Sequence, residues 1–241
     1  CSSDLGATHD SSAANNTDTR TINTTAPDMA ISLSGLPATA SVGVLYSGSF
    51  SCTNTGNADA AAGSRCGVTG LPAGVDVVGC TISPANAPWS EGSNVPAGQT
   101  VTCTVSGTPT TSGSATVTGT TGATHDSNPA NNSTTQAITV AAPDMSVSLA
   151  GLPATAAVGV PYTGSFSCSN VGTADATGAT RCSVTGLPSG LSVGACTISP
   201  SGTPWSEAAS VPAGATVTCP VSGTPTALGS STVTGTTGAT S

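Results

Sequence analysis

Apolar and polar residues alternate along many short stretches of this chain. Between residues 100 and 107, for example, Val101, Cys103 and Val105 are separated by threonines. A period of two is typical of a β-strand with one buried face, and no window has apolar residues at helical spacing. The pattern predicts seven strands in residues 26–141: Met29–Ser34, Gly48–Asn54, Arg65–Gly70, Val75–Ile82, Thr100–Gly107, Ala115–Thr121 and Thr134–Val140.

The chain contains this pattern twice, at an offset of 116 residues. Pro27-Asp28-Met29 recurs as Pro143-Asp144-Met145, and every cysteine except Cys1 has a counterpart at the same offset. Seven short strands with turn residues between them are typical of an immunoglobulin-like β-sandwich. We therefore expect an all-β protein with two tandem sandwiches, residues 26–141 and 142–241, preceded by an N-terminal strand segment, residues 1–25.

The repeat is cut one strand out of phase. Ser241 aligns with His125, so we expect the second sandwich to lack its own last strand. Residues 1–25 contain the match, because residues 6–10 are identical to residues 122–126 and Ile22 aligns with Ile138. An unpaired slot exposes backbone groups and core, and a strand from a neighbouring subunit can fill it. The predicted donor strand carries Thr17, Thr19, Thr21, Ile22 and Thr24.

Two other interpretations of the ends stay open. The sequence is a segment of a longer array, or the N-terminal segment folds back onto its own second sandwich. Thr17–Thr25 is also less apolar than Thr134–Val140, with Asn23 and Thr24 in place of Thr139 and Val140. Donation between neighbours is a heterologous contact that does not close on itself, so it predicts a filament of head-to-tail copies.

Charge excludes several partners. Only 6% of residues are charged, the three basic ones are arginines, and the net charge is −8. Nucleic acid and anionic membrane surfaces need several basic residues, so neither is an expected partner. No apolar run reaches the roughly 18 residues of a transmembrane helix. With 37% hydrophobic residues the chain is too apolar for a disordered one, yet with 2% aromatic residues each core is thin.

Nine cysteines indicate an oxidising, extracellular compartment and disulfides that reinforce the thin core. Their spacing matches no zinc or haem motif, and no CxxC pair is present. Cys66 and Cys80 flank what reads as a hairpin turn at residues 71–74, so we predict that they pair. That leaves Cys52 with Cys103, and the repeat adds Cys182–Cys196 and Cys168–Cys219. Cys1 has no partner in this scheme. It forms an intermolecular disulfide, carries a lipid as the N-terminus of a lipoprotein, or is a free thiol.

Catalytic and metal chemistry find little support in the sequence. His9 and His125 occupy one repeat position, and each adjoins an aspartate that points to the opposite face of a strand. We therefore expect no enzyme, no cofactor and no metal. Residues 126–132 are rich in the oxygen ligands that calcium binds, but aspartate and asparagine there favour a turn, which is the interpretation we prefer. Trp89 and Trp205 lie in loops, where they cover the core or contact a sugar or protein ligand.

The chain resembles the immunoglobulin-like repeat of very long bacterial surface and secreted proteins. The resemblance rests on the opening at Pro143–Val147, the second strand with its Phe166–Gly172 run, the turn at Val211–Gly214, and the closing motif at Asp126–Asn132. It implies a structural role in stalks, adhesins and wall-associated arrays, without catalytic residues. We therefore expect a structural subunit of an extracellular filament, sheath or pilus-like fibre; the alternative is a stalk or adhesin segment that binds a surface glycan or protein.

Overall fold

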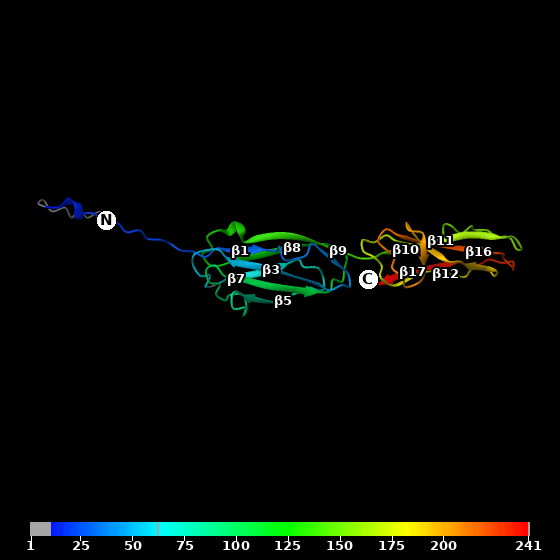
Figure 1. Cartoon of the computed structure of the whole chain (residues 1–241), viewed down its shortest axis with the longest axis horizontal. Helices are drawn as coiled ribbons and strands as arrows, with labels where there is room; N and C mark the ends of the chain where they lie inside the picture. Colours follow the sequence, from blue (N-terminus) through cyan, green and yellow to red (C-terminus); the bar gives the residue numbers. More distant parts are fainter. Residues whose placement is uncertain (1–10, 62, 241) are drawn as a thin grey trace.

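The computed structural model describes residues 11–61 and 63–240, which form two β-sandwiches that follow one another along the long axis of the molecule (Figure 1). Residues 11–28 lead into the outer end of the first sandwich. They contain one turn of 3-10 helix, η1 (Ala13–Asn15), and no strand. The prediction of an all-β fold with tandem immunoglobulin-like sandwiches is confirmed.

The first sandwich consists of two sheets packed face to face. One sheet has the strand order β1-β3-β7-β5-β6, and the other has the order β2-β9-β8-β4. Only β2 pairs in parallel, with β9, among the strands of the described chain. The strands are β1 (Met29–Ser32), β2 (Thr39–Ser41), β3 (Tyr46–Asn54), β4 (Arg65–Thr69), β5 (Val75–Ile82), β6 (Ala87–Trp89), β7 (Thr100–Gly107), β8 (Gly113–Gly122) and β9 (Ser133–Ala141), and a 3-10 turn, η2 (Pro129–Asn131), precedes β9.

The alternating residues of the strands form the core of this sandwich. Val101, Cys103 and Val105 of β7 are all 0% exposed, as the period of two predicts. Phe50 of β3 and Ile138 of β9 reach the same core from opposite sheets. Valine and half-cystine make up half of the buried residues in this core.

The second sandwich repeats the first sheet but only half of the second. Its first sheet has the order β10-β11-β16-β14-β15, with β13 also on β16, whereas its second sheet is the pair β12-β17. No strand forms at residues 155–157, the counterpart of β2. The strands are β10 (Met145–Ser148), β11 (Tyr162–Asn170), β12 (Gly178–Thr185), β13 (Leu191–Val193), β14 (Cys196–Ser199), β15 (Thr203–Trp205), β16 (Thr216–Gly223) and β17 (Thr234–Thr240).

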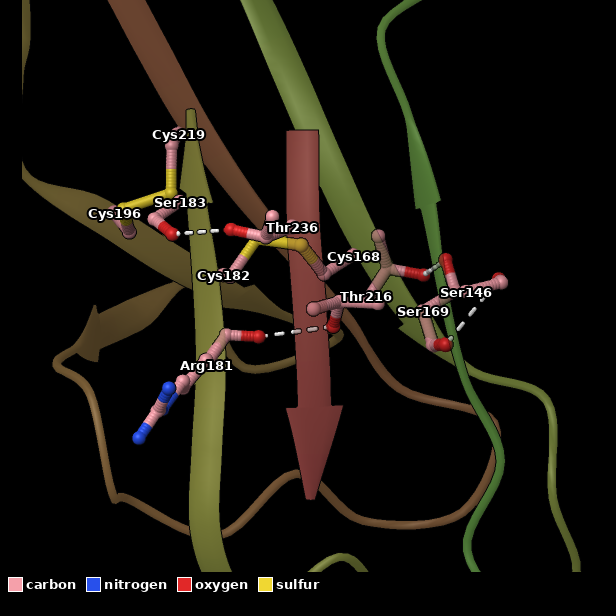
Figure 2. Close-up of a disulfide and its surroundings, with 11 residues drawn as sticks. Ser146, Cys168, Ser169, Arg181, Cys182, Ser183, Cys196, Thr216, Cys219 and Thr236 are labelled. Carbon is pink, nitrogen blue, oxygen red and sulfur yellow. Dashed lines mark hydrogen bonds between the residues drawn. A yellow bond between two sulfur atoms is a disulfide. The ribbon is translucent and has the colours of Figure 1, made fainter. Parts of the chain in front are cut away.

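Eight cysteines form four disulfides, but the predicted pairing is wrong. Cys52 is bonded to Cys66 and Cys80 to Cys103, rather than Cys66 to Cys80 and Cys52 to Cys103. The second sandwich follows the first, with Cys168–Cys182 and Cys196–Cys219 (Figure 2), instead of the predicted Cys182–Cys196 and Cys168–Cys219.

The reason for the error is the turn at residues 71–74. This turn does not close a hairpin, because β4 pairs with β8 in one sheet and β5 pairs with β7 in the other. Cys66 therefore faces Cys52 across the core, and their bond joins the two sheets. Cys80 lies directly opposite Cys103 on the neighbouring strand β7, so that bond stays within one sheet.

Gly56 lies against the segment by which the chain enters the first sandwich. A Cβ on this glycine would be 2.5 Å from both the Ala26 carbonyl oxygen and the Asp28 amide nitrogen. Asn57 holds the same segment in place, because its backbone N–H donates to Ala26 O and its side-chain Oδ1 accepts from Ala26 N. Gly172 holds the equivalent place where the chain enters the second sandwich.

We expect Gly56→Ala to destabilise the first sandwich by about 1–3 kcal/mol, as overpacking of a closely packed site typically does. Differential scanning calorimetry of the full chain measures the effect as a lower Tm. Gly79→Ala is the matched control, since a Cβ there meets nothing within 4 Å. Equal melting of the two variants would contradict the expectation.

Candidate functional site: an open strand groove in the second sandwich

Among the described residues, β17 is paired along one edge only, with β12. Figure 2 shows β17 beside β12, where Ser183 Oγ and Thr236 Oγ1 lie 2.8 Å apart and Thr237 Oγ1 donates to Arg181 O. The counterpart of β17 in the first sandwich, β8, is paired on both sides, with β4 and with β9. Among the described residues of the second sandwich, no strand takes the position of β9.

A groove of about 510 Å³ lies beside residues 229–233, which lead into β17. The Tyr162 hydroxyl donates to Pro153 O at its wall, and burial raises the pKa of that hydroxyl. The lining mixes polar and apolar surface, and it comes from strands of the first sheet and from the loops that follow β12 and lead into β17. The main apolar side chains are those of Leu149, Leu152, Tyr162, Leu187, Leu191 and Val233.

The same positions are closed in the first sandwich. Four counterparts that are at most 4% exposed there are only half-buried here: Leu33 becomes Leu149, Leu36 becomes Leu152, Tyr46 becomes Tyr162 and Val117 becomes Val233. Away from the groove the copies agree, because Phe50 and Phe166 are 2% and 1% exposed. The opening is therefore local to the position of one strand.

In the first sandwich, β9 fills this position with three inward-facing side chains. Ile138 is 0% exposed and Val140 is 3% exposed. The side chain of Gln136 donates from Nε2 to Leu36 O over 2.6 Å. Together they cover the leucines, the tyrosine and the valine whose counterparts form the groove walls.

The loop before β9 is tied to the start of β1. The Asp126 carboxylate accepts hydrogen bonds from the amides of Met29 and Asn128, at 3.1 and 3.0 Å. The side chain of Asn131 donates to Asp28 Oδ1 at 2.9 Å. These oxygens serve turn and strand contacts, as the turn interpretation of residues 126–132 predicts.

The residues predicted for a donor strand are exposed. Ile22 is 82% exposed, and Thr17, Thr19, Thr21 and Thr24 are also exposed. Aligned with β9, Ile22 and Thr24 correspond to the buried Ile138 and Val140, whereas the other three threonines correspond to outward-facing residues.

Arg20 was missed by the sequence reasoning. It corresponds to Gln136, the third inward-facing residue of β9. Its spacing of two from Ile22 is the signal that could have identified it, because residues two apart share a face of a strand.

The other predicted site residues lie elsewhere. Trp89 and Trp205 are 7% and 8% exposed and belong to the two cores, so neither presents an open ring face on which a sugar could stack. Their burial agrees with the interpretation that they cover the core. Cys1 lies outside the described residues.

The described part of the chain contains neither a metal-ligating cluster nor a membrane-spanning helix. Within residues 11–61 and 63–240, no group of three or more histidine, cysteine, aspartate or glutamate side chains is placed to hold a metal ion. In the same part of the chain, no helix is long and apolar enough to cross a membrane. The absence of catalytic activity stays a prediction.

Comparisons with known proteins give only distant structural similarities. No protein-family model and no curated protein matches the chain. The CARDB domain of a Pyrococcus furiosus protein, solved in complex with di-metal ions, is 20% identical over 52% of this chain and 99% of that domain, with a TM-score of 0.34. The adhesin InvE of Yersinia pseudotuberculosis is 12% identical over 88% of this chain and 58% of its own, with a TM-score of 0.27. The secreted serine protease VesC of Vibrio cholerae is 15% identical over 83% and 49%, with a TM-score of 0.26.

Proposed function

We propose that this chain is a structural subunit of an extracellular filament, in which residues 17–25 of one copy fill the groove in the second sandwich of the next. One observation carries the proposal: the groove has the position of β9, and residues 17–25 align with β9 so that Ile22 falls on Ile138. The occupant is therefore a second copy of this chain.

The repeat offset gives the register of the donated strand. In the first sandwich, Ile138 lies opposite Ala115 and Gln136 lies opposite Val117. The same register brings Ile22 opposite Ser231 and Arg20 opposite Val233. Ile22 then enters the groove beside its leucine side chains, and Arg20 has the Leu152 carbonyl in reach as Gln136 has that of Leu36. The donated strand has no net charge, because Asp18 balances the Arg20 that shares its inward face.

Chain geometry argues against the fold-back alternative. Strand β9 ends at the boundary with the second sandwich, where Ala142 is bonded to Thr173. By the same register, a strand in the second groove ends at the outer end of the second sandwich. Only residues 26–28 connect Thr25 to β1, and three residues span at most about 11 Å. A nine-residue strand such as β11 alone is about 30 Å long, so a chain's own segment cannot reach both places.

The contact between copies is therefore heterologous. Each copy offers a donor at one end and a groove at the other, which adds subunits head to tail without closure. The four disulfides support an oxidising, extracellular location, where such bonds persist. The low charge leaves little repulsion between packed neighbours.

Electron microscopy of the full chain and of a variant lacking residues 1–25 tests the proposal. We expect filaments from the full chain and single particles from the shortened chain. Within the described part of the chain, residues 13–25 make no hydrogen bond to either sandwich, so their loss removes no such contact from the fold. Single particles from the full chain at high concentration would overturn the filament. They would favour the stalk or adhesin segment, in which a different polypeptide segment fills the groove.

A further inference from the structure

The donor segment contains a turn as well as a strand. Residues 13–15 form the 3-10 turn η1, and in the first sandwich the 3-10 turn η2 occupies the aligned residues 129–131. We propose that residues 11–16 are a second docking element of the donor, which closes over the start of β10 and places the Asn15 amide on the Asp144 carboxylate. This inference rests on the proposed function and extends its contact surface beyond the strand.

The first sandwich contains the model for this contact. Its turn is joined to the entering strand by the bond from Asn131 Nδ2 to Asp28 Oδ1, 2.9 Å long. A backbone bond from Ser127 N to Pro27 O, also 2.9 Å, lies beside it. Under these contacts Pro27 is buried and Met29 is 0% exposed.

The second sandwich presents the matching acceptor without a partner. Asp144 is held as Asp28 is, since its amide donates to Asn170 Oδ1 at 3.0 Å and its carbonyl accepts from Val171 N at 2.7 Å. Within the described part of the chain, however, its carboxylate receives no hydrogen bond. Asp144 is exposed, and Pro143 and Met145 are only half-buried. The cover that η2 gives to β1 is missing from β10.

The donor turn is formed before it docks. The backbone N–H of Asn15 donates to Ser12 O at 3.3 Å, and in η2 the backbone N–H of Asn131 donates to Asn128 O at 3.4 Å. A turn that already has its bound conformation loses less conformational entropy on binding. The side-chain amide of Asn15 then donates to the Asp144 carboxylate. Hydrogen bonds to charged groups are stronger than those between neutral groups.

Peptide binding to the full chain separates the turn from the strand. The full chain with Ile22→Asp serves as the receptor, because its own segment can neither reach its groove nor pack in a neighbour's. Calorimetric titration compares a peptide of residues 11–26 with one of residues 17–26. We expect the longer peptide to bind at least about tenfold more tightly, the effect of one charge-assisted hydrogen bond. Equal affinities would overturn the docking turn, and failure of both peptides to bind would overturn the proposed function itself.

A charge exchange then tests the pair of residues. The Asn15→Asp peptide is expected to lose the tenfold advantage, because two carboxylates would face each other. An Asp144→Asn receptor is expected to restore it, since an amide again meets a carboxylate. The Asn23→Asp peptide is the control for added charge, because its counterpart Thr139 is exposed. Equal loss in the Asn15→Asp and Asn23→Asp peptides, or no recovery in the Asp144→Asn receptor, contradicts the assignment.

Discussion

Replacing Ile22 by aspartate is expected to abolish assembly while both sandwiches stay folded. Ile22 is 82% exposed in the single chain, so the substitution removes no packing from it. In the proposed filament the same side chain is buried as Ile138 is, at 0% exposure. Burial of an isoleucine contributes about 1.5–3 kcal/mol, and removing a carboxylate from water beside the leucines of the groove adds a further cost.

The expected weakening of the contact is at least about 100-fold, since every 1.4 kcal/mol is a factor of ten. Analytical ultracentrifugation measures it as a rise in the concentration at which filaments form. Asn23→Asp is the matched control, with the same added charge on the neighbouring residue, whose counterpart Thr139 points outward. Filaments from Ile22→Asp at the concentration used for the unmodified chain would rule out the proposed register.

Removing the bridge between the sheets, with Cys52→Ala and Cys66→Ala together, is expected to cost the first sandwich about 3 kcal/mol. A loop of about 15 residues gives a stabilisation of this size in the chain-entropy estimate, and the two cysteines are 14 residues apart. Both are buried, at 0% and 4% exposure, so the alanines also leave unfilled space in the core. Against a total stability of about 5–15 kcal/mol for a domain, the loss is large.

Scanning calorimetry of the full chain measures this loss as a lower Tm for the unfolding transition of the first sandwich. Cys168→Ala with Cys182→Ala is the matched pair, because the same bridge occurs in the second sandwich. Peptide mapping without reductant checks the connectivity itself, where Cys52 joined to Cys103 would contradict the structure. An unchanged Tm in the variant would show that the bridge between the sheets contributes little.

Local pattern was sufficient to predict most strands. The alternation in β7 gives its buried face directly, and the repeat offset aligns Ile22 with the buried Ile138. The disulfide pairing could not be predicted this way. A Leu-Pro-Ala-Gly turn looks the same whether it closes a hairpin or carries the chain from one sheet to the other, and only the partners of β4 and β5 decide.

Strand β2 illustrates a second limit. Residues 39–41 become a strand only because β9 lies beside them, and their counterparts at residues 155–157 form none. The groove walls follow the same rule, since Leu36 and Leu152 have nearly identical local sequences but different burial. Sequence alone therefore predicts that a strand is missing, but it does not give the shape that the missing strand leaves.

The direction of the chain through each sandwich has a mechanical consequence. The chain enters the first sandwich at one end, at Ala26, and leaves it at the other, at Ala141, so a pull on the ends acts along the strands. Hydrogen bonds between β8 and β9 run across that direction, from Gly113 opposite Val140 to Thr120 opposite Ser133. A stretching force is thus shared by the whole ladder at once, as shear, and does not open it pair by pair. In the proposed filament, the donated strand bears tension in the same way as β9.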